Sequence, residues 1–83
     1  MFLARIYVTP KPTVNDPQGQ TIMSGLTSMG FDSIGSVRAG KYFEIRLNEP
    51  NHESATERVQ QMCDRLLANM VIEEYRFDVD ESP

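Results

Sequence analysis

Residues 35–47 read GSVRAGKYFEIRL, and two different functions would follow from two ways of folding this stretch. Gly35, Gly40 and Lys41 reproduce the spacing of a P-loop, in which backbone N–H groups and a lysine hold nucleotide phosphates at the start of a helix. A P-loop lysine is followed by a small hydroxyl residue that binds magnesium, whereas Lys41 is followed by Tyr42. No helical period begins there. The sequence therefore argues against a nucleotide-binding loop.

The second half of this stretch has the two-residue period of a half-buried strand. The same parity continues upstream across Gly40, so one set of apolar side chains would share a face: Val37, Ala39, Phe43, Ile45 and Leu47. We therefore predict one long strand over residues 37–47 that bends at Gly40. A strand of this length exceeds the usual five or six residues, so its far end could leave its own sheet and pair elsewhere.

Length and composition indicate one small domain spanning residues 1–83. Hydrophobic residues make up 40% of the chain and charged residues 24%, which is ordinary for a globular domain. A chain this short buries only about 60–65% of the surface of its unfolded form, so its core is thin and oligomerisation would stabilise it. The net charge of −4 argues against nucleic acid as a partner.

Sequence features also bear on the cellular compartment. No run of the chain approaches the roughly 18 apolar residues of a membrane span. The first residues lack the pattern of a secretory signal, because Arg5 interrupts the apolar start. A single cysteine, Cys63, fits a reducing compartment. We expect a cytoplasmic protein that does not associate with membranes.

Two further segments predict strands. Residues 2–9 alternate with the even-numbered side chains toward the core, and Pro10 and Pro12 end this strand because they lack backbone donors. Residues 71–80 form the last strand, which is followed by a tail of residues 81–83.

Two segments predict helices. Asp16 and Pro17 are suited to the N-cap and the first position of a helix that Gly30 closes. Ser54 and Glu57 have the spacing of a capping box at the start of a second helix, which ends at Ala68-Asn69. The second helix carries the strongest apolar stripe of the chain: Ala55, Val59, Met62, Cys63, Leu66, Leu67 and Met70.

Two glycines weaken the first predicted helix. Gly19 and Gly25 each cost about 1 kcal/mol of helix stability relative to alanine. Either the helix tolerates them, or another part of the chain packs so closely there that a side chain would not fit.

The order of elements predicts an α+β fold, a β-α-β-α-β ferredoxin-like two-layer sandwich. We expect an antiparallel sheet with both helices on one face and the long bent strand at its centre. The other sheet face would mix aromatic, aliphatic and charged side chains: Leu3, Arg5, Tyr7, Arg38, Tyr42, Glu44, Arg46, Ile72, Glu74 and Arg76. Such a face is either solvated, as in many antiparallel sheets, or a subunit contact, which is enriched in tyrosine and arginine.

No group of residues has the pattern of a catalytic or metal site. His52 is the only histidine and falls in a polar segment, where a solvated loop residue is expected. Cys63 lies on the apolar stripe, as a buried and inert thiol would. Glu73 and Glu74 are neighbours on a strand and point to opposite faces, so they cannot act on one substrate atom.

Four segments together resemble a known family. They are Tyr7-Val8-Thr9-Pro10, Asp16-Pro17-Gln18-Gly19, Val37-Arg38-x-Gly40-Lys41, and Leu66-Leu67-Ala68-Asn69 before Val71-Ile72-Glu73. In this order and over almost the whole chain they resemble the PurS-type small subunit of phosphoribosylformylglycinamidine synthase. One departure is Met70, where proline often follows the asparagine in such sequences.

The resemblance implies a subunit of a purine-biosynthesis ligase that converts formylglycinamide ribonucleotide to its amidine with ATP and glutamine. In that family a large synthetase subunit binds ATP and magnesium, and a glutaminase subunit releases ammonia. The small subunit forms a homodimer or homotetramer and bridges the other two. It implies that this chain alone is inactive, with no catalytic, cofactor or metal site. The partner-interface residues that it suggests are Asp16, Pro17, Gly19, Arg38, Gly40 and Lys41.

Two other functions remain open on the residues alone. One is a stand-alone regulatory module of ferredoxin-like fold that binds a small molecule. The other is a small phosphate-hydrolysing enzyme, for which residues 35–41 are the only candidate anion-binding loop; the strand pattern argues against it.

Overall fold

The computed structural model of the chain describes residues 1–82. Its elements follow the predicted order and confirm the α+β fold class, with a short π-helical turn added after the second helix. In chain order they are β1 (Phe2–Pro10), α1 (Pro17–Ser28), β2 (Lys41–Leu47), α2 (His52–Met62), η1 (Cys63–Leu67) and β3 (Glu73–Glu81).

β1 is the central strand of a three-stranded antiparallel sheet with the order β2-β1-β3. Ile6, for example, pairs with Phe43 on one side and Phe77 on the other. The predicted parity of β1 is confirmed, since Phe2, Ala4, Ile6 and Val8 are all buried. The prediction that the strand containing Lys41–Leu47 is central was wrong. β2 and β3 carry most of the outward charges, which are typical of edge strands, whereas β1 carries only Arg5.

The predicted long bent strand is also shorter than expected. β2 begins at Lys41, and residues 31–40 form no regular secondary structure. The physical reason lies in β1, whose pairing with β2 ends where Val8 meets Lys41. Beyond this point β1 runs into Pro10 and Pro12, which have no backbone N–H to offer. The upstream residues thus keep the parity of a strand but have no partner strand within residues 1–82 of the same chain.

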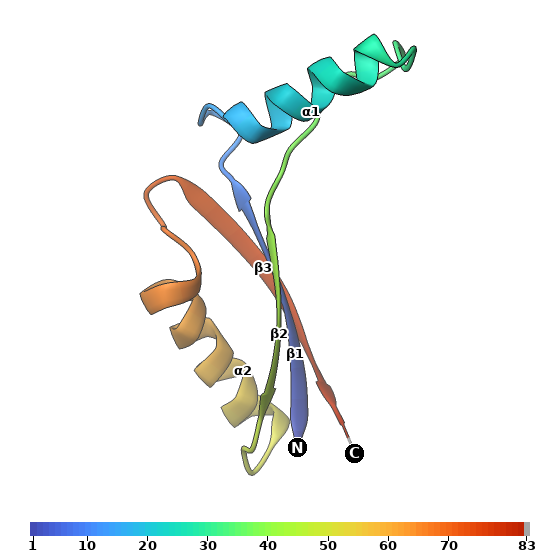
Figure 1. Cartoon of the computed structure of the whole chain (residues 1–83). Coiled ribbons are helices and arrows are strands. Elements are labelled where there is room, and N and C mark those ends of the chain that lie inside the picture. The colour runs from blue at the N-terminus through green and yellow to red at the C-terminus, as the bar shows by residue number, and fades with distance from the viewer. Residues whose placement is uncertain (83) are drawn as a thin grey trace.

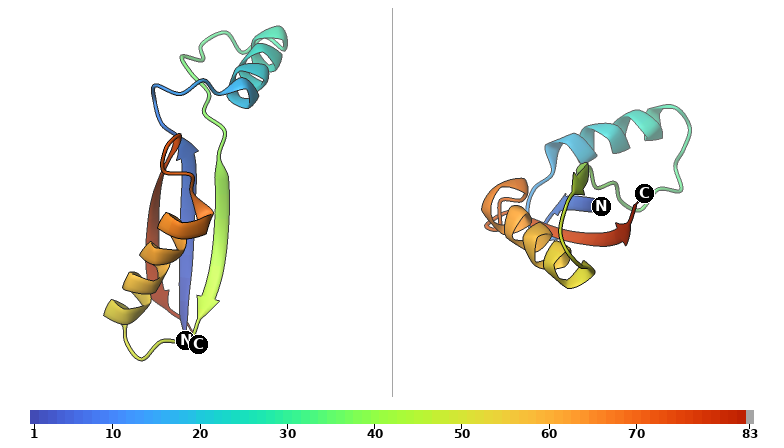
Figure 2. Two further views of the ribbon diagram at one scale, coloured as in Figure 1. Left: turned by 90° about the vertical axis from the view of Figure 1, so that its left-hand side faces the viewer. Right: turned by 90° about the horizontal axis from the view of Figure 1, so that it is seen from below.

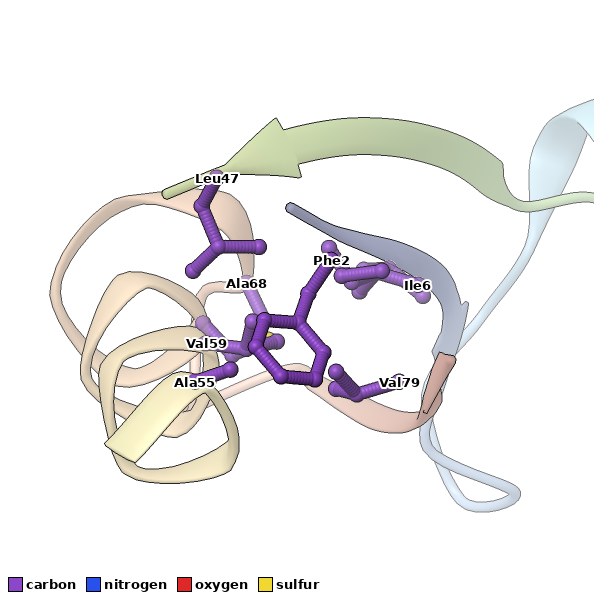
Figure 3. Close-up of a cluster of buried hydrophobic side chains, with 10 residues drawn as sticks. Phe2, Ile6, Leu47, Ala55, Val59, Ala68 and Val79 are labelled. Atoms are coloured by element: carbon purple, nitrogen blue, oxygen red, sulfur yellow. The ribbon is translucent and has the colours of Figure 1, made fainter. Parts of the chain in front are cut away.

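The core lies between the sheet and α2 (Figure 3), where side chains from all three strands meet the helix. Ala55, Val59 and Cys63 of the predicted apolar stripe are completely buried. Figure 2 shows α2 lying along one sheet face, with the start of β1 and the end of β3 together at one end of the sheet. Ser82 N–H donates to the Met1 carbonyl at 2.8 Å, so part of the predicted tail is tied to the first strand; Pro83 lies outside the described residues.

The start of α2 and the geometry of its last turn differ from the prediction, whereas the predicted end is confirmed, because Ala68 is the C-cap of η1. The helix begins at His52, and its N-cap is Asn51, whose side chain accepts a hydrogen bond from the Ser54 backbone N–H at 2.8 Å. The proposed capping box is therefore wrong, and the Ser54 hydroxyl instead donates to Glu49 at 2.6 Å. At the other end η1 is a π-helical turn, in which the Ala68 N–H donates to the Cys63 carbonyl five residues earlier instead of four. This turn rotates Leu66 out of the apolar stripe, and the residue is 83% exposed.

α1 does not cover the sheet, so the prediction of two helices on one face was wrong (Figure 1). It lies beyond the end of the sheet, carried there by extended connections, and both its apolar residue Ile22 and its C-cap Met29 are exposed. Its predicted ends are confirmed, with Asp16 as N-cap and Gly30 at a positive φ of 100°. The result is an elongated molecule with a radius of gyration of 16.2 Å, whereas a compact domain of this size has about 12 Å.

Candidate functional site

Five of the six residues predicted at an interface lie close to the crossing of two connections. The first connection leads from β1 to α1 and holds Asp16; the second leads from α1 to β2 and holds Arg38 and Gly40. Gly19 faces the second connection, and Lys41 begins β2. Pro17 occupies the first turn of α1 as predicted and is exposed.

Asp16 is the buried acid of this crossing, with 8% of its surface exposed. One carboxylate oxygen accepts a hydrogen bond from the Gly19 backbone N–H at 3.0 Å, which is the predicted helix cap. The other accepts from the Ala39 backbone N–H at 2.9 Å. These two bonds, helped by the charge of Arg38, lower the pKa of Asp16 below its usual value. The carboxylate therefore joins the start of α1 to a segment 23 residues away.

Gly19 allows this close approach. A Cβ at this position would collide with the Asp16 carboxylate and with the Val37 carbonyl oxygen. A Cβ at Gly25, in the same helix, would meet nothing within 4 Å. Of the two readings of these glycines, close packing is therefore right for Gly19 and tolerance for Gly25.

Arg38 makes the reciprocal contact from the second connection. Its Nη2 donates to the Pro10 carbonyl at 2.7 Å and to the Lys11 carbonyl at 2.6 Å. These carbonyls lie where β1 ends, beside a backbone bond of 2.9 Å from the Lys11 N–H to the Ile72 carbonyl. Arg38 therefore binds the carbonyl of the last residue of β1 and that of Lys11 after it, which also accepts from the Val14 N–H, and it does not lie on the open face of the sheet as predicted.

Gly40 and Lys41 lie next to the crossing. A Cβ at Gly40 would collide with the Val8 carbonyl oxygen, so this position also requires glycine for packing. The Lys41 ammonium lies 3.4 Å from the Glu73 carboxylate and 3.5 Å from the Leu67 carbonyl. Lys41 thus connects β2 to the segment between η1 and β3. Whether any of the six residues touches a partner stays a prediction.

The sheet face opposite α2 has no covering element among residues 1–82. Tyr7 and Tyr42 lie with ring centroids 5.1 Å apart, and the Arg76 guanidinium lies 4.0 Å from the Tyr7 ring centre. Arg5 pairs with Asp80 at 3.0 Å and, more loosely, with Asp78 at 3.4 Å. Ile72, which was expected on this face, lies in the turn before β3.

A shallow cavity of about 460 Å³ opens beside the end of this face. Tyr7, Tyr42 and Arg76 line it together with Gly40 and Lys41. The cavity combines aromatic surface with two cations and the Glu74 carboxylate, and it shares residues with both the open face and the crossing.

The two chemically reactive side chains, His52 and Cys63, are engaged in contacts with other parts of the fold. His52 is the first residue of α2, not a loop residue: its Nε2 lies 2.8 Å from the Val79 carbonyl, and its ring meets Phe2 edge-on. Cys63 is buried as predicted, and burial raises the pKa of its thiol. Within residues 1–82 no three His, Cys, Asp or Glu side chains are grouped to hold a metal ion. In the same part of the chain, no helix has the length and apolar character needed to cross a membrane.

The hydrogen bond from the Ala39 N–H to Asp16 could not be predicted from the sequence. The pattern Asp16-Pro17 predicts a helix cap, which is a local feature. The bond to Ala39 depends on how α1 is turned relative to the second connection, and no local spacing encodes this direction. The only signal was Gly19, one of the two helix glycines at which another part of the chain could pack closely.

Comparison with known proteins identifies the family. Residues 3–81 match the family described as "PurS: Phosphoribosylformylglycinamidine (FGAM) synthase". The phosphoribosylformylglycinamidine synthase subunit PurS of Synechocystis sp. is 48% identical over 78 residues, which are 94% of this chain and 78% of that protein.

Solved structures agree over nearly the whole chain. A PurS structure from B. subtilis has a TM-score of 0.87 at 40% identity, covering 98% of this chain and all of that one. A chain in the structure of PurLQS from Thermotoga maritima has a TM-score of 0.85 at 30% identity, covering 96% of this chain and 99% of that one. The resemblance seen in the sequence is thereby confirmed, and the chain belongs to the PurS family.

Proposed function

We propose that this chain is a non-catalytic scaffold subunit of phosphoribosylformylglycinamidine synthase. That enzyme converts formylglycinamide ribonucleotide to formylglycinamidine ribonucleotide with ATP and glutamine. The observation that carries the proposal is the likeness, over 96% of the chain, to a chain in the structure of PurLQS from Thermotoga maritima. The chain's own residues support it, because they offer surfaces for contact and reactive groups that are already engaged in structural roles.

Contact with other subunits is supported by what a single copy leaves uncovered. The segment after α1 exposes Met29 at 73% and Phe31 at 54%. The open sheet face presents Tyr7, Tyr42 and Arg76, the residue types that are enriched in protein interfaces. We propose that the chain forms a homodimer or homotetramer and bridges the large synthetase subunit and the glutaminase subunit.

The scaffold role assigns the chemistry to the other subunits. In this proposal ATP and magnesium bind the large synthetase subunit, and glutamine is hydrolysed by the glutaminase subunit. The small chain brings the two together, so that ammonia released at one reaches the other. We expect this assembly in the cytoplasm and expect the isolated chain to be inactive.

An assay with two nitrogen sources tests the proposal. The synthetase and glutaminase subunits of the same organism are purified and assayed with glutamine or with ammonium chloride, each with and without this chain. A scaffold is required for the glutamine-dependent rate but not for the ammonia-dependent rate, because only the former needs both subunits in one complex. Copurification of all three chains should accompany the gain. A glutamine-dependent rate that is the same with and without the chain would refute the scaffold role.

A further inference from the structure

The hydrophobic core divides the molecule into two parts. All core side chains, including the partly buried ones that pack against it, come from residues 2–8 and 43–79. The segment of residues 11–40, here called the arm, contains α1 and both of its connections and contributes none of them. Figure 2 shows the arm projecting from one end of the sheet. Something other than core packing must therefore hold α1 in its direction.

Two side chains tie the connections of the arm to each other. Asp16 lies on the first connection and accepts the Ala39 N–H of the second. Arg38 lies on the second connection and donates to the Pro10 and Lys11 carbonyls of the first. Each bond has one charged partner, which makes it stronger than a bond between neutral groups. The bond from Arg38 to Pro10 joins the arm to the end of β1. The other bonds join the two connections, so α1 cannot turn about one connection alone without stretching them.

Close backbone packing completes the arrangement. At Gly19 the helix comes so near Val37 that no Cβ fits between them. The absence of a side chain there lets the carboxylate of Asp16 reach both N–H groups, Gly19 at 3.0 Å and Ala39 at 2.9 Å. Ala39 belongs to no helix or strand, and its N–H donates to this carboxylate.

We propose that Asp16 and Arg38 form a clasp that sets the direction of α1 relative to the sheet and thereby positions the arm for contact with the partner subunits. The first half concerns the chain alone. The second half rests on the proposed function, and the two are tested separately.

Nuclear magnetic resonance of the full chain tests the clasp. Asp16→Asn replaces one carboxylate oxygen by an NH₂ group, so the side chain can no longer accept from both N–H groups. We expect the Ala39 amide to exchange about tenfold faster or more, because a bond to a charged group is lost. Residual dipolar couplings of α1 should shrink relative to those of β1 as the arm becomes mobile. Asp32→Asn, an equal change at an exposed residue, is the control and should leave both unchanged.

The outcomes of this experiment are distinct. Amide exchange in β1 should stay slow in every variant, because the core does not include the arm. If the couplings of α1 keep their wild-type values in Asp16→Asn and in Arg38→Met, then the clasp does not set its direction and the proposal is overturned.

Assembly with the purified synthetase and glutaminase subunits tests the second half. Arg38→Met keeps the length of the side chain but removes its donors, and Arg58→Met makes the same change at an exposed position on α2. We expect affinity for the complex to fall tenfold or more in Arg38→Met and to stay unchanged in Arg58→Met. Wild-type affinity in an Arg38→Met chain whose α1 has become mobile would overturn the positioning role while leaving the scaffold function intact. If the wild-type chain itself fails to assemble, the proposed function fails, and the magnetic resonance experiment still decides the clasp.

Discussion

Two glycine-to-alanine substitutions in α1 should have opposite effects on its stability. Gly25→Ala places a methyl group in open space, since nothing lies within 4 Å of the added Cβ. It should therefore stabilise the helix by about 1 kcal/mol, the difference in intrinsic helix propensity. Gly19→Ala has the same propensity gain in principle, although the new Cβ collides with the Asp16 carboxylate and the Val37 carbonyl.

The collision should outweigh the propensity. Overpacking by one methyl group costs about 1–3 kcal/mol when its neighbours are fixed. Both neighbours are constrained here, because Val37 offers backbone and Asp16 is held by two hydrogen bonds. Relief requires the first turn of α1 to move away from the second connection, which breaks the Ala39 bond. Because neither neighbour can yield freely, we place the cost in the upper part of that range, at about 2–3 kcal/mol. Subtracting the propensity gain of about 1 kcal/mol leaves a net loss for Gly19→Ala of about 1–2 kcal/mol in the local stability of α1.

Amide hydrogen exchange along α1 is the suitable assay, because the helix lies outside the core and global unfolding would report on it poorly. Exchange of the α1 amides should slow about fivefold in Gly25→Ala and speed up about five- to thirtyfold in Gly19→Ala. The Gly25 variant is the control for propensity alone. If Gly19→Ala slows exchange as much as Gly25→Ala does, the close approach of α1 to Val37 is absent and the clasp loses its basis.

Three further predictions concern the core, the thiol and the carboxylate. Val59→Ala, at a completely buried position, should lower the free energy of unfolding in urea by about 2 kcal/mol or more. Leu66→Ala, at a position that is 83% exposed, should change it by less than about 0.5 kcal/mol. Equal effects of the two substitutions would contradict the outward rotation of Leu66 at η1. Because burial raises the pKa of the Cys63 thiol, a disulfide reagent at neutral pH should modify the folded chain much more slowly than the denatured chain, and similar rates would refute its burial. The pKa of Asp16 lies below its ordinary 3.8, so its contribution to holding the arm is present above pH 3.8 and is lost as the pH falls through the lower pKa of the folded chain. The amide chemical shifts of Gly19 and Ala39 should report this titration, and the titration should be absent in Asp16→Asn.

Much of the fold could be predicted from local pattern. The alternation in β1 correctly identified its buried side, and Asp16 with Pro17 and Gly30 marked both ends of α1. Patterns of this kind work because a strand or a helix repeats with a fixed period and each cap is formed within a few residues. The failures were positional, namely which strand is central and where α1 lies, and both depend on contacts between segments far apart in the chain.

In the candidate site, the residues were predictable from the sequence, whereas their contacts were not. Sequence pattern and family resemblance selected Asp16, Gly19, Arg38 and Gly40, and the structure places all four at or beside one crossing. What they do there was not predictable: a carboxylate that caps a helix also binds Ala39, and an arginine expected on a sheet face binds the end of β1. Such bonds join residues more than 20 positions apart.

The sequence by itself determined the order of the elements, the buried side of each strand and the family to which the chain belongs, because these depend on periodicity and short motifs. Only the tertiary structure decided that α1 stands away from the sheet, that β2 begins only at Lys41, and that Leu66 faces solvent. The physical reason is that pairing needs a partner. The residues upstream of Lys41 have the pattern of a strand, but β1 turns away at Pro10, and a strand pattern without a neighbouring strand forms no sheet.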